Sequence, residues 1–353
     1  MNKASIIIPT FKRVNLLKDI LKSVISQDLV YEILVIDSNS EDGTRELVNS
    51  YNNYSDIKVQ YFNVVNNVSL KRNTGIKESS TNFLIFLDDD CIPHKDFVKH
   101  HIHSLENKAH TINCGNVFFP LLGIEKSNYI RYKDSRHIPY RHNKSKVKLL
   151  NYQSIVTMNM SINKKDILDN NIFFKEDFIG YGMEDNEFGC QAISSGMKIE
   201  TCAASIDHME DNNPFLFAAK IFHTARDGVY KLINVNEKAA MNLRYSFFFE
   251  PDFKHKNKFS HNLIKFVRLF CSIKIAKIIL KFVNYSDSIK FLYFPLFYKY
   301  ILASYYYAGV KNRKDAYSKV SEVSDSWYLN SISDSKKQNI HILKATNKAQ
   351  EET

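Results

Sequence analysis

Residues 83–90 read Phe-Leu-Ile-Phe-Leu-Asp-Asp-Asp, five apolar residues that run directly into three aspartates. A short apolar run is typical of a buried strand, so we expect a strand over Phe83–Leu87 with Asp88, Asp89 and Asp90 at its carboxyl end. Three adjacent carboxylates repel one another unless a cation lies between them. Such oxygen clusters suit Mg²⁺ or Mn²⁺, which also bind phosphate oxygens. The alternative is an acidic loop or helix cap, and the position after a buried strand favours the metal site.

The segments on either side of this strand alternate between strand-like and helix-like patterns. Strands are expected over four apolar or alternating runs: Ala4–Pro9, Tyr31–Asp37, Ile57–Phe62 and Thr111–Phe119. Helices are expected over four runs with helical spacing: Val14–Ile25, Ser40–Tyr51, Ser69–Ser79 and Lys95–Leu105. This alternation predicts an α/β fold with a mostly parallel sheet flanked by helices. Ligands of such sheets bind beyond the carboxyl ends of the strands, which places Pro9, Thr10 and Asp37 beside the three aspartates.

The chain beyond residue 119 divides less regularly. Residues 120–150 are polar, basic and aromatic, and we expect them to form a surface excursion. Further elements are expected as a strand over Ile155–Ile162, a helix over Asn186–Ser195 and a strand over Met197–Ile206 that closes at Asp207–His208. The pattern predicts three parts: an α/β domain over residues 1–215, a helical region over 216–330 and a polar tail over 331–353.

A second group of carboxylates follows two glycines in the segment Gly180–Asp185. Glu184 and Asp185 open an expected helix after a flexible turn, and a carboxylate in that position can take a proton from a hydroxyl. Both are therefore candidate catalytic bases. Helix-capping acids that complement the helix dipole are the alternative. Two carboxylate clusters in one α/β domain favour a site that combines a metal with a base.

Three further residues could serve the same site. His208 follows a strand and could complete a metal shell. Arg13 and Arg72 could contact a phosphate or a nucleotide base. A lone histidine is more often structural, and a lone arginine is more often a surface charge, so these assignments depend on the two carboxylate clusters.

The positive charge of the chain is concentrated in its C-terminal part. Residues 1–250 contain 30 Lys/Arg and 30 Asp/Glu, whereas residues 251–353 contain 18 and 8. Over Lys274–Val283 the lysines share one helical face, while Ile275, Ile278, Ile279 and Phe282 take the other. This pattern predicts a basic amphipathic helix in peripheral contact with an anionic membrane surface. Interleaved aromatic and basic residues would also suit single-stranded nucleic acid, but the helical pattern favours the membrane and no nucleic acid partner is expected.

The remaining composition limits where the protein could act. With Leu263–Phe270, which is also amphipathic, the segment Lys274–Val283 is expected to form two short helices or one kinked helix. Ile289–Val310 is more apolar, but no run of about 18 uncharged apolar residues suggests a spanning helix. Five scattered cysteines without a CxxC pair argue against a zinc knuckle and favour a reducing compartment. The first strand begins almost at the N-terminus, without a signal-peptide pattern. We therefore expect a cytoplasmic protein at the inner face of the cell membrane.

In order and spacing, the motifs of residues 4–210 resemble those of family-2 glycosyltransferases with the GT-A fold. The matching segments are Ser5–Arg13, Ile36–Thr44, Ser69–Gly75, Phe86–Asp90, Gly182–Phe188 and Asp207–His208. One departure is Ser38, which stands where the family often has a second acid after Asp37.

The resemblance implies a role for each matching residue. A nucleotide would be held by a set of seven residues: Pro9, Thr10, Arg13, Asp37, Arg72, Asp88 and Asp89. Asp88 and Asp90 match the ends of the family's Asp-x-Asp motif, so Asp90 would bind the metal, with Asp88 and His208 as further ligands. Asp185 matches the base of inverting members, and Glu184 lies beside it.

These expectations combine into an inverting, metal-dependent glycosyltransferase. It would move a sugar from a nucleotide-diphosphate donor to a hydroxyl of a glycan or lipid-linked glycan, as in bacterial surface-polysaccharide assembly. A divalent metal stabilises charge on the leaving phosphate, and a carboxylate takes the acceptor proton. One alternative is a catalytically silent glycan-binding scaffold, which is disfavoured because both carboxylate clusters are intact. Another is a sugar nucleotidyltransferase, which is disfavoured because no glycine-rich loop precedes Gly43.

Overall fold

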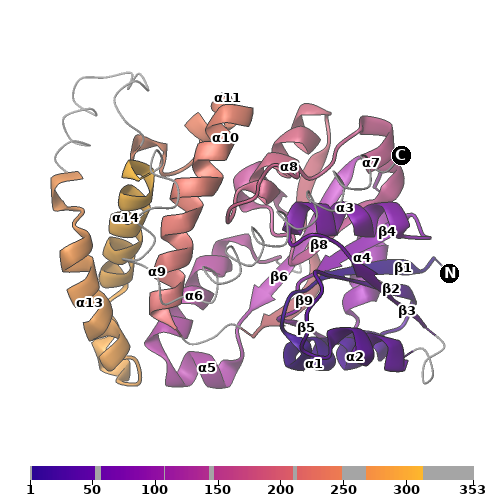
Figure 1. The fold of residues 1–353 in the computed structure, drawn as a ribbon, viewed down its shortest axis with the longest axis horizontal. Coiled ribbons are helices and arrows are strands. Elements are labelled where there is room, and N and C mark those ends of the chain that lie inside the picture. Colours follow the sequence, from indigo (N-terminus) through magenta and orange to yellow (C-terminus); the bar gives the residue numbers. More distant parts are fainter. Residues whose placement is uncertain are drawn as a thin grey trace, which may run out of the picture.

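The structure, a computed structural model, describes residues 2–51, 57–106, 108–142, 147–209, 213–248 and 268–312. A central sheet carries helices on both faces, and a further group of helices stands beside it (Figure 1). The strands are β1 (Ala4–Pro9), β2 (Val30–Asp37), β3 (Lys58–Asn63), β4 (Phe83–Leu87), β5 (Cys91–Pro93), β6 (Thr111–Phe118), β7 (Leu149–Leu150), β8 (Asn159–Asn163) and β9 (Lys198–His208).

Within the described ranges the strand order is β3-β2-β1-β4-β8-β6-β9-β5, and β7 also pairs with β9. The first four strands in this order are parallel, and β6 is parallel to β9. The strands β8, β5 and β7 pair antiparallel with their neighbours. The sheet is therefore mixed, and its parallel part delivers the carboxyl ends of β1, β2 and β4 to the same edge, as predicted.

Helices cover both faces of the sheet. Around it lie α1 (Val14–Ile25), α2 (Thr44–Tyr51), α3 (Val68–Glu78), α4 (Phe97–Glu106), α7 (Lys164–Asn170) and α8 (Glu184–Ser194). Alternate residues of β1 serve the two faces: Ile6 and Ile8 pack with α1, α2 and α4, whereas Ile7 packs with α3, α7 and α8. All six residues of β1 are buried, which explains why this strand is a continuous apolar run rather than an alternating one.

The predicted elements of this domain are confirmed, with shifts at some ends. The strand predicted over Ile155–Ile162 begins only at Asn159, because a 3₁₀ turn over Tyr152–Ser154 precedes it. The strand predicted to end at Ile206 continues to His208, since its last residues pair with β5. The helix α8 begins at Glu184, directly after Met183 in a left-handed conformation.

The C-terminal helices form a bundle beside the sheet. Its members are α9 (Pro214–His223), α10 (Val229–Val235), α11 (Glu237–Met241), α13 (Ile273–Tyr285) and α14 (Pro295–Lys311). A π-helical turn, η3 (Thr224–Gly228), joins α9 to α10, and short 3₁₀ turns lie at Ile138–Tyr140, Ser246–Phe248 and Lys290–Leu292. The helix α14 packs against both α9 and α13, and α13 lies at the outer edge of the molecule (Figure 1). Among the helices that the structure describes, none combines the length and the apolar character needed to cross a bilayer.

The helix predicted at Lys274–Val283 corresponds to α13, and the apolar segment Ile289–Val310 contains a 3₁₀ turn followed by α14. Most of the helix predicted at Leu263–Phe270, and the whole tail over 331–353, lie outside the described residues. The residues of α13 that are buried in the bundle are Ala276, Leu280 and Val283, and Ile279 and Phe282 of the apolar face identified in the sequence also contact it. The boundary at residue 215 stays a prediction.

The prediction of a surface excursion over residues 120–150 was wrong for its first half. Residues 121–137 form α5 (Leu121–Lys126) and α6 (Asn128–His137), and α6 buries Tyr129 and Tyr132 against the C-terminal bundle. In the sequence, basic residues interrupt the apolar pattern of α6, so its buried face is not recognisable. One of them, Lys133, is itself buried, and its ammonium lies 4.0 Å from the centre of the Phe217 ring.

Candidate active site

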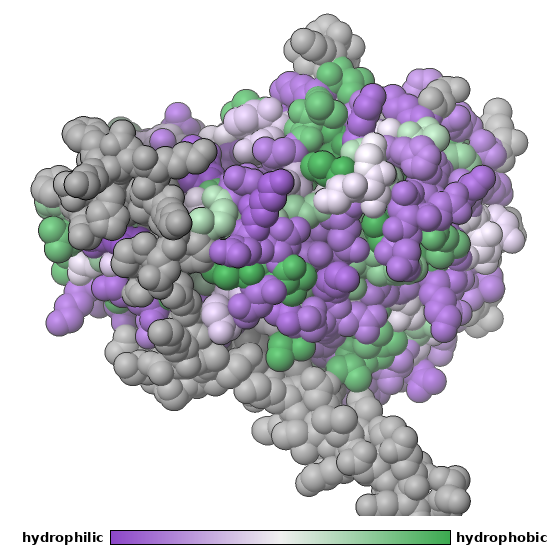
Figure 2. All heavy atoms as spheres, turned by 90° about the horizontal axis from the view of Figure 1, so that it is seen from above, coloured by the Kyte–Doolittle hydropathy of each residue, from purple (hydrophilic) through white to green (hydrophobic). Residues whose placement is uncertain are grey.

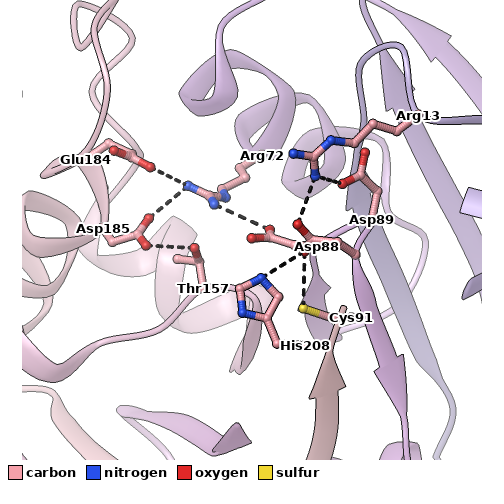
Figure 3. Close-up of polar contacts among 10 residues, drawn as sticks. Arg13, Arg72, Asp88, Asp89, Cys91, Thr157, Glu184, Asp185 and His208 are labelled. Carbon is pink, nitrogen blue, oxygen red and sulfur yellow. Dashed lines mark hydrogen bonds and ion pairs between the residues drawn. The ribbon is translucent and has the colours of Figure 1, made fainter. Parts of the chain in front are cut away.

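The loops after β1 and β4 meet at one edge of the sheet (Figure 3). Directly after Pro9, Thr10 donates from Oγ1 to Asp89 Oδ2 over 2.7 Å. Arg13 Nη1 donates to Asp89 and to Asp90, each over 2.9 Å. Burial opposes the charge of Arg13, but the two carboxylates raise the pKa of its guanidinium above its usual range. The parallel strands thus bring Thr10 beside the aspartates, as the sequence pattern predicts.

The three aspartates have different neighbours. Asp89 is buried against the loop after β1, whereas Asp90 faces His208. Asp88 faces Arg72, whose Nη2 lies 3.6 Å from Asp88 Oδ1. Burial raises the pKa of Asp88 to about 6, although Arg72 opposes the shift. Of the three side chains, Asp88 is the most exposed at 29%, followed by Asp90 at 15% and Asp89 at 7%.

Among the described residues, one group could hold a metal ion: ligand atoms of Asp90, Cys91 and His208 lie within 4.8 Å of one another. Burial opposes the ionisation of Asp90, but His208 and Arg13 lower its pKa below the usual range, so it is a carboxylate. Burial and the neighbouring aspartates raise the pKa of the Cys91 thiol well above its usual value, and a neutral thiol is a weak ligand. The oxygen of Asp90 and the imidazole of His208 fit Mn²⁺, or Mg²⁺ with added phosphate oxygens. Asp88, predicted as a further ligand, lies outside this group.

Arg72 connects the two carboxylate clusters. It projects from α3, and its Nη1 donates to Asp185 Oδ1 over 2.8 Å and to Glu184 Oε1 over 3.1 Å. The same guanidinium is paired with Asp88 and lies against the Phe174 ring, 5.3 Å from its centre. Arg72 was predicted to place a nucleotide, which stays a prediction. Its contacts here join the aspartates after β4 to the acids that open α8.

The acid pair that opens α8 is held in an asymmetric way. Besides its bond to Arg72, Asp185 accepts a hydrogen bond at Oδ2 from Thr157 Oγ1 over 2.9 Å. The side chain of Asp185 is 27% exposed, whereas that of Glu184 is 11% exposed. Burial, with help from Asp185, raises the pKa of Glu184 to about 7. Of the two predicted bases, Asp185 is thus the more accessible.

Asp37 ends β2 with its carboxylate directed inwards. Its Oδ1 accepts from Ser40 Oγ over 2.6 Å, and its Oδ2 accepts from the Ser40 backbone N–H and from the Tyr61 hydroxyl over 2.8 and 2.9 Å. These bonds fix the turn that follows β2. The predicted contact between Asp37 and a nucleotide stays a prediction.

Sequence reasoning missed two residues of this site. Lys71 is buried, and its Nζ donates to the carbonyl oxygen of Thr10 over 2.7 Å; burial lowers its pKa to about 8. Its place beside Arg72 in a matching motif was the available signal. Nothing in the sequence indicated that Thr157 belongs to the site. It lies in a loop that was interpreted as part of a strand, and its partner Asp185 is 28 residues away.

A sheet of this kind, with carboxylates, two arginines and a histidine gathered beyond its parallel strand ends, is typical of nucleotide-sugar-binding domains with the GT-A fold. The described fold is similar to a solved structure, a mannosyltransferase from Pyrobaculum calidifontis in complex with GDP-Man and Mn²⁺. The TM-score is 0.54 at 13% identity, over 88% of this chain and 87% of that one. Residues 5–169 match the sequence profile of "Glycosyl transferase family 2", and this part of the chain belongs to that family.

Curated relatives match a smaller part of the chain. Glycosyltransferase AglE of Haloferax volcanii is 32% identical over 119 residues, which are 33% of this chain and 39% of the relative. A β-1,3-glucosyltransferase of Campylobacter jejuni that is named for GalNAc(5)-diNAcBac-PP-undecaprenol is 38% identical over 94 residues, 26% of this chain and 30% of that protein. The chain thus spans less than half the length of these two relatives.

Proposed function

We propose that this chain transfers a sugar from a nucleotide-diphosphate donor to an acceptor hydroxyl, with inversion and with a divalent cation. The observation that carries the proposal is the contact of one buried guanidinium, Arg72, with both Asp88 and Asp185. In the family motifs these two carboxylates belong to the donor side and the acceptor side of the reaction. Because both carboxylates pair with the same guanidinium, the donor and the acceptor hydroxyl would meet at one site.

The proposed chemistry follows from the charges of the site. When bound, a cation held by Asp90 and His208 would stabilise the negative charge that develops on the leaving diphosphate. Arg13 pairs with both Asp89 and Asp90, and His208 together with Arg13 keeps Asp90 ionised for this purpose.

Asp185 accepts the proton that the acceptor hydroxyl loses as it attacks. Thr157 and Arg72 each donate to one of its oxygens, so the carboxylate is oriented while a further lone pair on each oxygen remains for the acceptor. The neighbouring Glu184 is more buried and has a pKa near 7, so at neutral pH it is a partly protonated partner of Arg72 rather than the base. Direct attack needs no covalent intermediate, and the product therefore has inverted configuration at the sugar carbon.

The proposed acceptor is a glycan or lipid-linked glycan of a polysaccharide pathway. Support comes from the family and from the Campylobacter jejuni relative, whose name specifies an undecaprenol-linked acceptor. The donor nucleotide, the sugar and the linkage are to be determined by experiment.

Donor binding is the experiment that tests the transferase proposal. UDP, GDP, CDP and dTDP sugars are titrated against the full chain with and without Mn²⁺, and the melting temperature is followed, since a ligand of the folded state raises it. We expect metal-dependent stabilisation by one nucleotide class, and its loss in Asp90→Ala. Asp185→Asn should keep donor binding and lose turnover. No stabilisation by any nucleotide sugar in folded protein would instead favour the silent scaffold, and an active Asp185→Asn would refute the assigned base.

We also propose that the C-terminal bundle contacts the inner face of the cell membrane through α13. Ile275, Ile278, Phe282 and Tyr285 recur at three- and four-residue spacing, so they share one face of this helix. All four are exposed, Ile278 by 68% and Tyr285 by 86%. On the face of the molecule seen in Figure 2, by contrast, hydrophilic residues cover most of the described surface and hydrophobic ones lie in small separate groups.

The charge around this apolar face fits an anionic surface. Lys274, Lys277 and Lys281 lie on its flank, and the sequences of α13 and α14 contain no acid. Asp287, which follows α13, accepts a bond from the Tyr129 backbone N–H over 2.7 Å and so is used inside the bundle. Pairing this face with a second copy would place lysines against lysines, whereas anionic headgroups would neutralise them.

Vesicle flotation tests the membrane contact. The full chain should float with vesicles that contain phosphatidylglycerol and much less with pure phosphatidylcholine. Combining Ile278→Glu with Phe282→Glu should abolish flotation, whereas Leu168→Glu, which changes a 53% exposed leucine on α7, should not. Flotation that survives the paired substitution, or a dimer in wild type that the substitution dissociates, would refute the membrane surface.

A further inference from the structure

The turn that delivers Asp185 has an unusual backbone. Gly182 and Met183 have φ angles of 84° and 74°, and Glu184 follows as the first residue of α8. Two consecutive left-handed residues are rare, and a methionine in that conformation costs energy that its surroundings must offset. The side chain of Met183 packs into the apolar cluster of the C-terminal bundle, together with Phe178 and Val229. Something outside the turn therefore holds it.

The element against this turn is the π-helical turn η3 in the C-terminal bundle. A Cβ on Gly228 would lie 2.2 Å from the carbonyl oxygen of Gly182, and a Cβ on Gly182 would lie 3.1 Å from Thr224 Oγ1. A Cβ on Gly180 would lie 2.4 Å from the Cβ of Asp227. Gly228 thus packs directly on the backbone of Gly182, at a distance that only glycine allows, while Gly180 and Gly182 pack against the side chains of Asp227 and Thr224.

These glycines differ from ordinary turn glycines elsewhere in the chain. Gly43 and Gly196 also have positive φ angles, but a Cβ on either would meet nothing within 4 Å. There the glycine serves only the backbone conformation. At Gly180 and Gly228 no positive φ angle is needed, so close packing explains the glycine.

The π-helical turn is itself fixed from both sides. Within it, Arg226 donates from Nε and Nη2 to the two oxygens of Asp227 over 2.6 and 2.8 Å. From the other side α14 approaches through Gly309, on which a Cβ would lie 2.8 Å from the Cβ of Ala225 in this turn. A π-helical turn at such a junction is a frequent mark of a functional site.

We propose that η3 is the element that positions the catalytic base, with Gly228 and Asp227 as positioning residues that act through the Gly180–Met183 turn on Asp185. This inference rests on the proposed function, in which Asp185 is the base. It gives the C-terminal bundle a part in catalysis that is independent of membrane contact. In the proposed function the donor and the metal are held mainly by residues after β1 and β4 and by His208, so a displaced turn should impair the chemical step and leave donor binding intact.

The first test is Gly228→Ala in the full chain. The added methyl group must push the Gly182 carbonyl away, and displacement of a catalytic group by about 1 Å costs on the order of 100-fold in rate. We expect kcat to fall by about that factor, while the donor dissociation constant, measured by titration, stays within about twofold. The matched control is Gly123→Ala in α5, where the nearest atom would be Ile130 Cγ2 at 3.4 Å, an ordinary contact. The control should retain full kcat.

A double-mutant cycle with Asp185→Asn separates positioning from general damage. If Gly228 acts through Asp185, then Gly228→Ala added to Asp185→Asn should lower kcat no further, because the group being positioned is already gone. Additive losses would refute the proposal, as would a Gly228→Ala enzyme with normal kcat. If Asp185→Asn alone kept normal activity, the base assignment would fail instead, so the two failures are distinguishable.

Asp227→Asn is the second variant, in case Gly228→Ala does not fold. It keeps the volume against Gly180 but weakens the pair with Arg226. We expect a loss in kcat that is smaller than that of Gly228→Ala, unchanged donor affinity, and no further loss in combination with Asp185→Asn. A loss of donor affinity equal to the loss of kcat would mark a general structural role and overturn the inference.

Discussion

Replacing Arg72 by methionine tests whether one guanidinium holds the two carboxylate clusters together. The side chain is 4% exposed, and its nitrogens lie 2.8 Å from Asp185, 3.1 Å from Glu184 and 3.6 Å from Asp88. Methionine keeps an unbranched apolar stem but leaves three carboxylates without their common cation. Removing one partner of a buried ion pair typically costs about 3–5 kcal/mol. Because Asp88 and Asp185 keep some contact with solvent, we expect the lower end, about 3 kcal/mol of unfolding free energy at pH 8.

The loss should depend on pH in a defined direction. Burial already raises the pKa of Glu184 to about 7 and that of Asp88 to about 6, even though Arg72 opposes both shifts. A carboxyl whose pKa is raised by folding contributes stability that is fully present below its unfolded pKa and lost as the pH rises through its folded pKa. Without Arg72 the pKa values of both carboxyls rise further. Protonation therefore removes the repulsion among the carboxylates at a higher pH than in wild type. Between pH 8 and pH 5.5 the difference from wild type should therefore shrink to about 1 kcal/mol.

Equilibrium urea unfolding, followed by circular dichroism at pH 8.0 and 5.5, measures both quantities. The control is Arg45→Met, the same change at an exposed arginine that lies over the Tyr61 ring, and it should alter stability by less than about 0.5 kcal/mol. A loss below about 1 kcal/mol at pH 8 would refute the magnitude. An equal loss at both pH values would refute the assignment of the loss to uncompensated carboxylates.

Three further predictions follow from the site and the bundle. Leu280→Ala on α13 should lower the unfolding free energy by about 2–5 kcal/mol because the side chain is buried. Ile278→Ala on the exposed face of the same helix should change it by less than about 0.5 kcal/mol. Urea unfolding measures both values. In wild type kcat should fall as the pH drops through about 7, because Glu184 becomes protonated and Arg72 then pairs more strongly with the base Asp185. The pH–rate profile of Glu184→Gln should lack this step. His208→Ala should weaken Mn²⁺-dependent thermal stabilisation by the donor, but less than Asp90→Ala, since the carboxylate supplies the charge; equal effects would argue against that ranking.

The parallel core could be predicted because its physics is local. In β4 four of five consecutive apolar residues are buried, with helices on both faces, so the strand is visible in the sequence as an unbroken apolar run. Parallel strands end at one edge, so the residues after β1 and β4 had to be neighbours whatever the details of packing. The contacts of Thr10 and Arg13 with Asp89 follow from this rule.

The connection through Arg72 could not be predicted in the same way. Its partners Glu184 and Asp185 lie 112 and 113 residues away, and no spacing rule relates a residue of α3 to the first turn of α8. The same limit applies to α6. Its buried face is interrupted by Lys133, which is stabilised over an aromatic ring of α9 and therefore does not look like a core residue in the sequence.

The C-terminal region shows what composition cannot reveal about packing. Its basic and apolar residues predicted a surface helix, and α13 has such a face, but the packing that reaches the active site is made by glycines. Gly228 and Gly309 do not contribute to a periodic apolar pattern. Their role depends on the absence of a side chain, which allows the neighbouring segment to approach closely. One apolar cluster joins Phe178, beside the catalytic turn, to Tyr306 on α14. A fragment that ended at residue 215 would expose Phe178 and lose the surface that holds Gly182, so the site and the bundle must be treated as one packing unit.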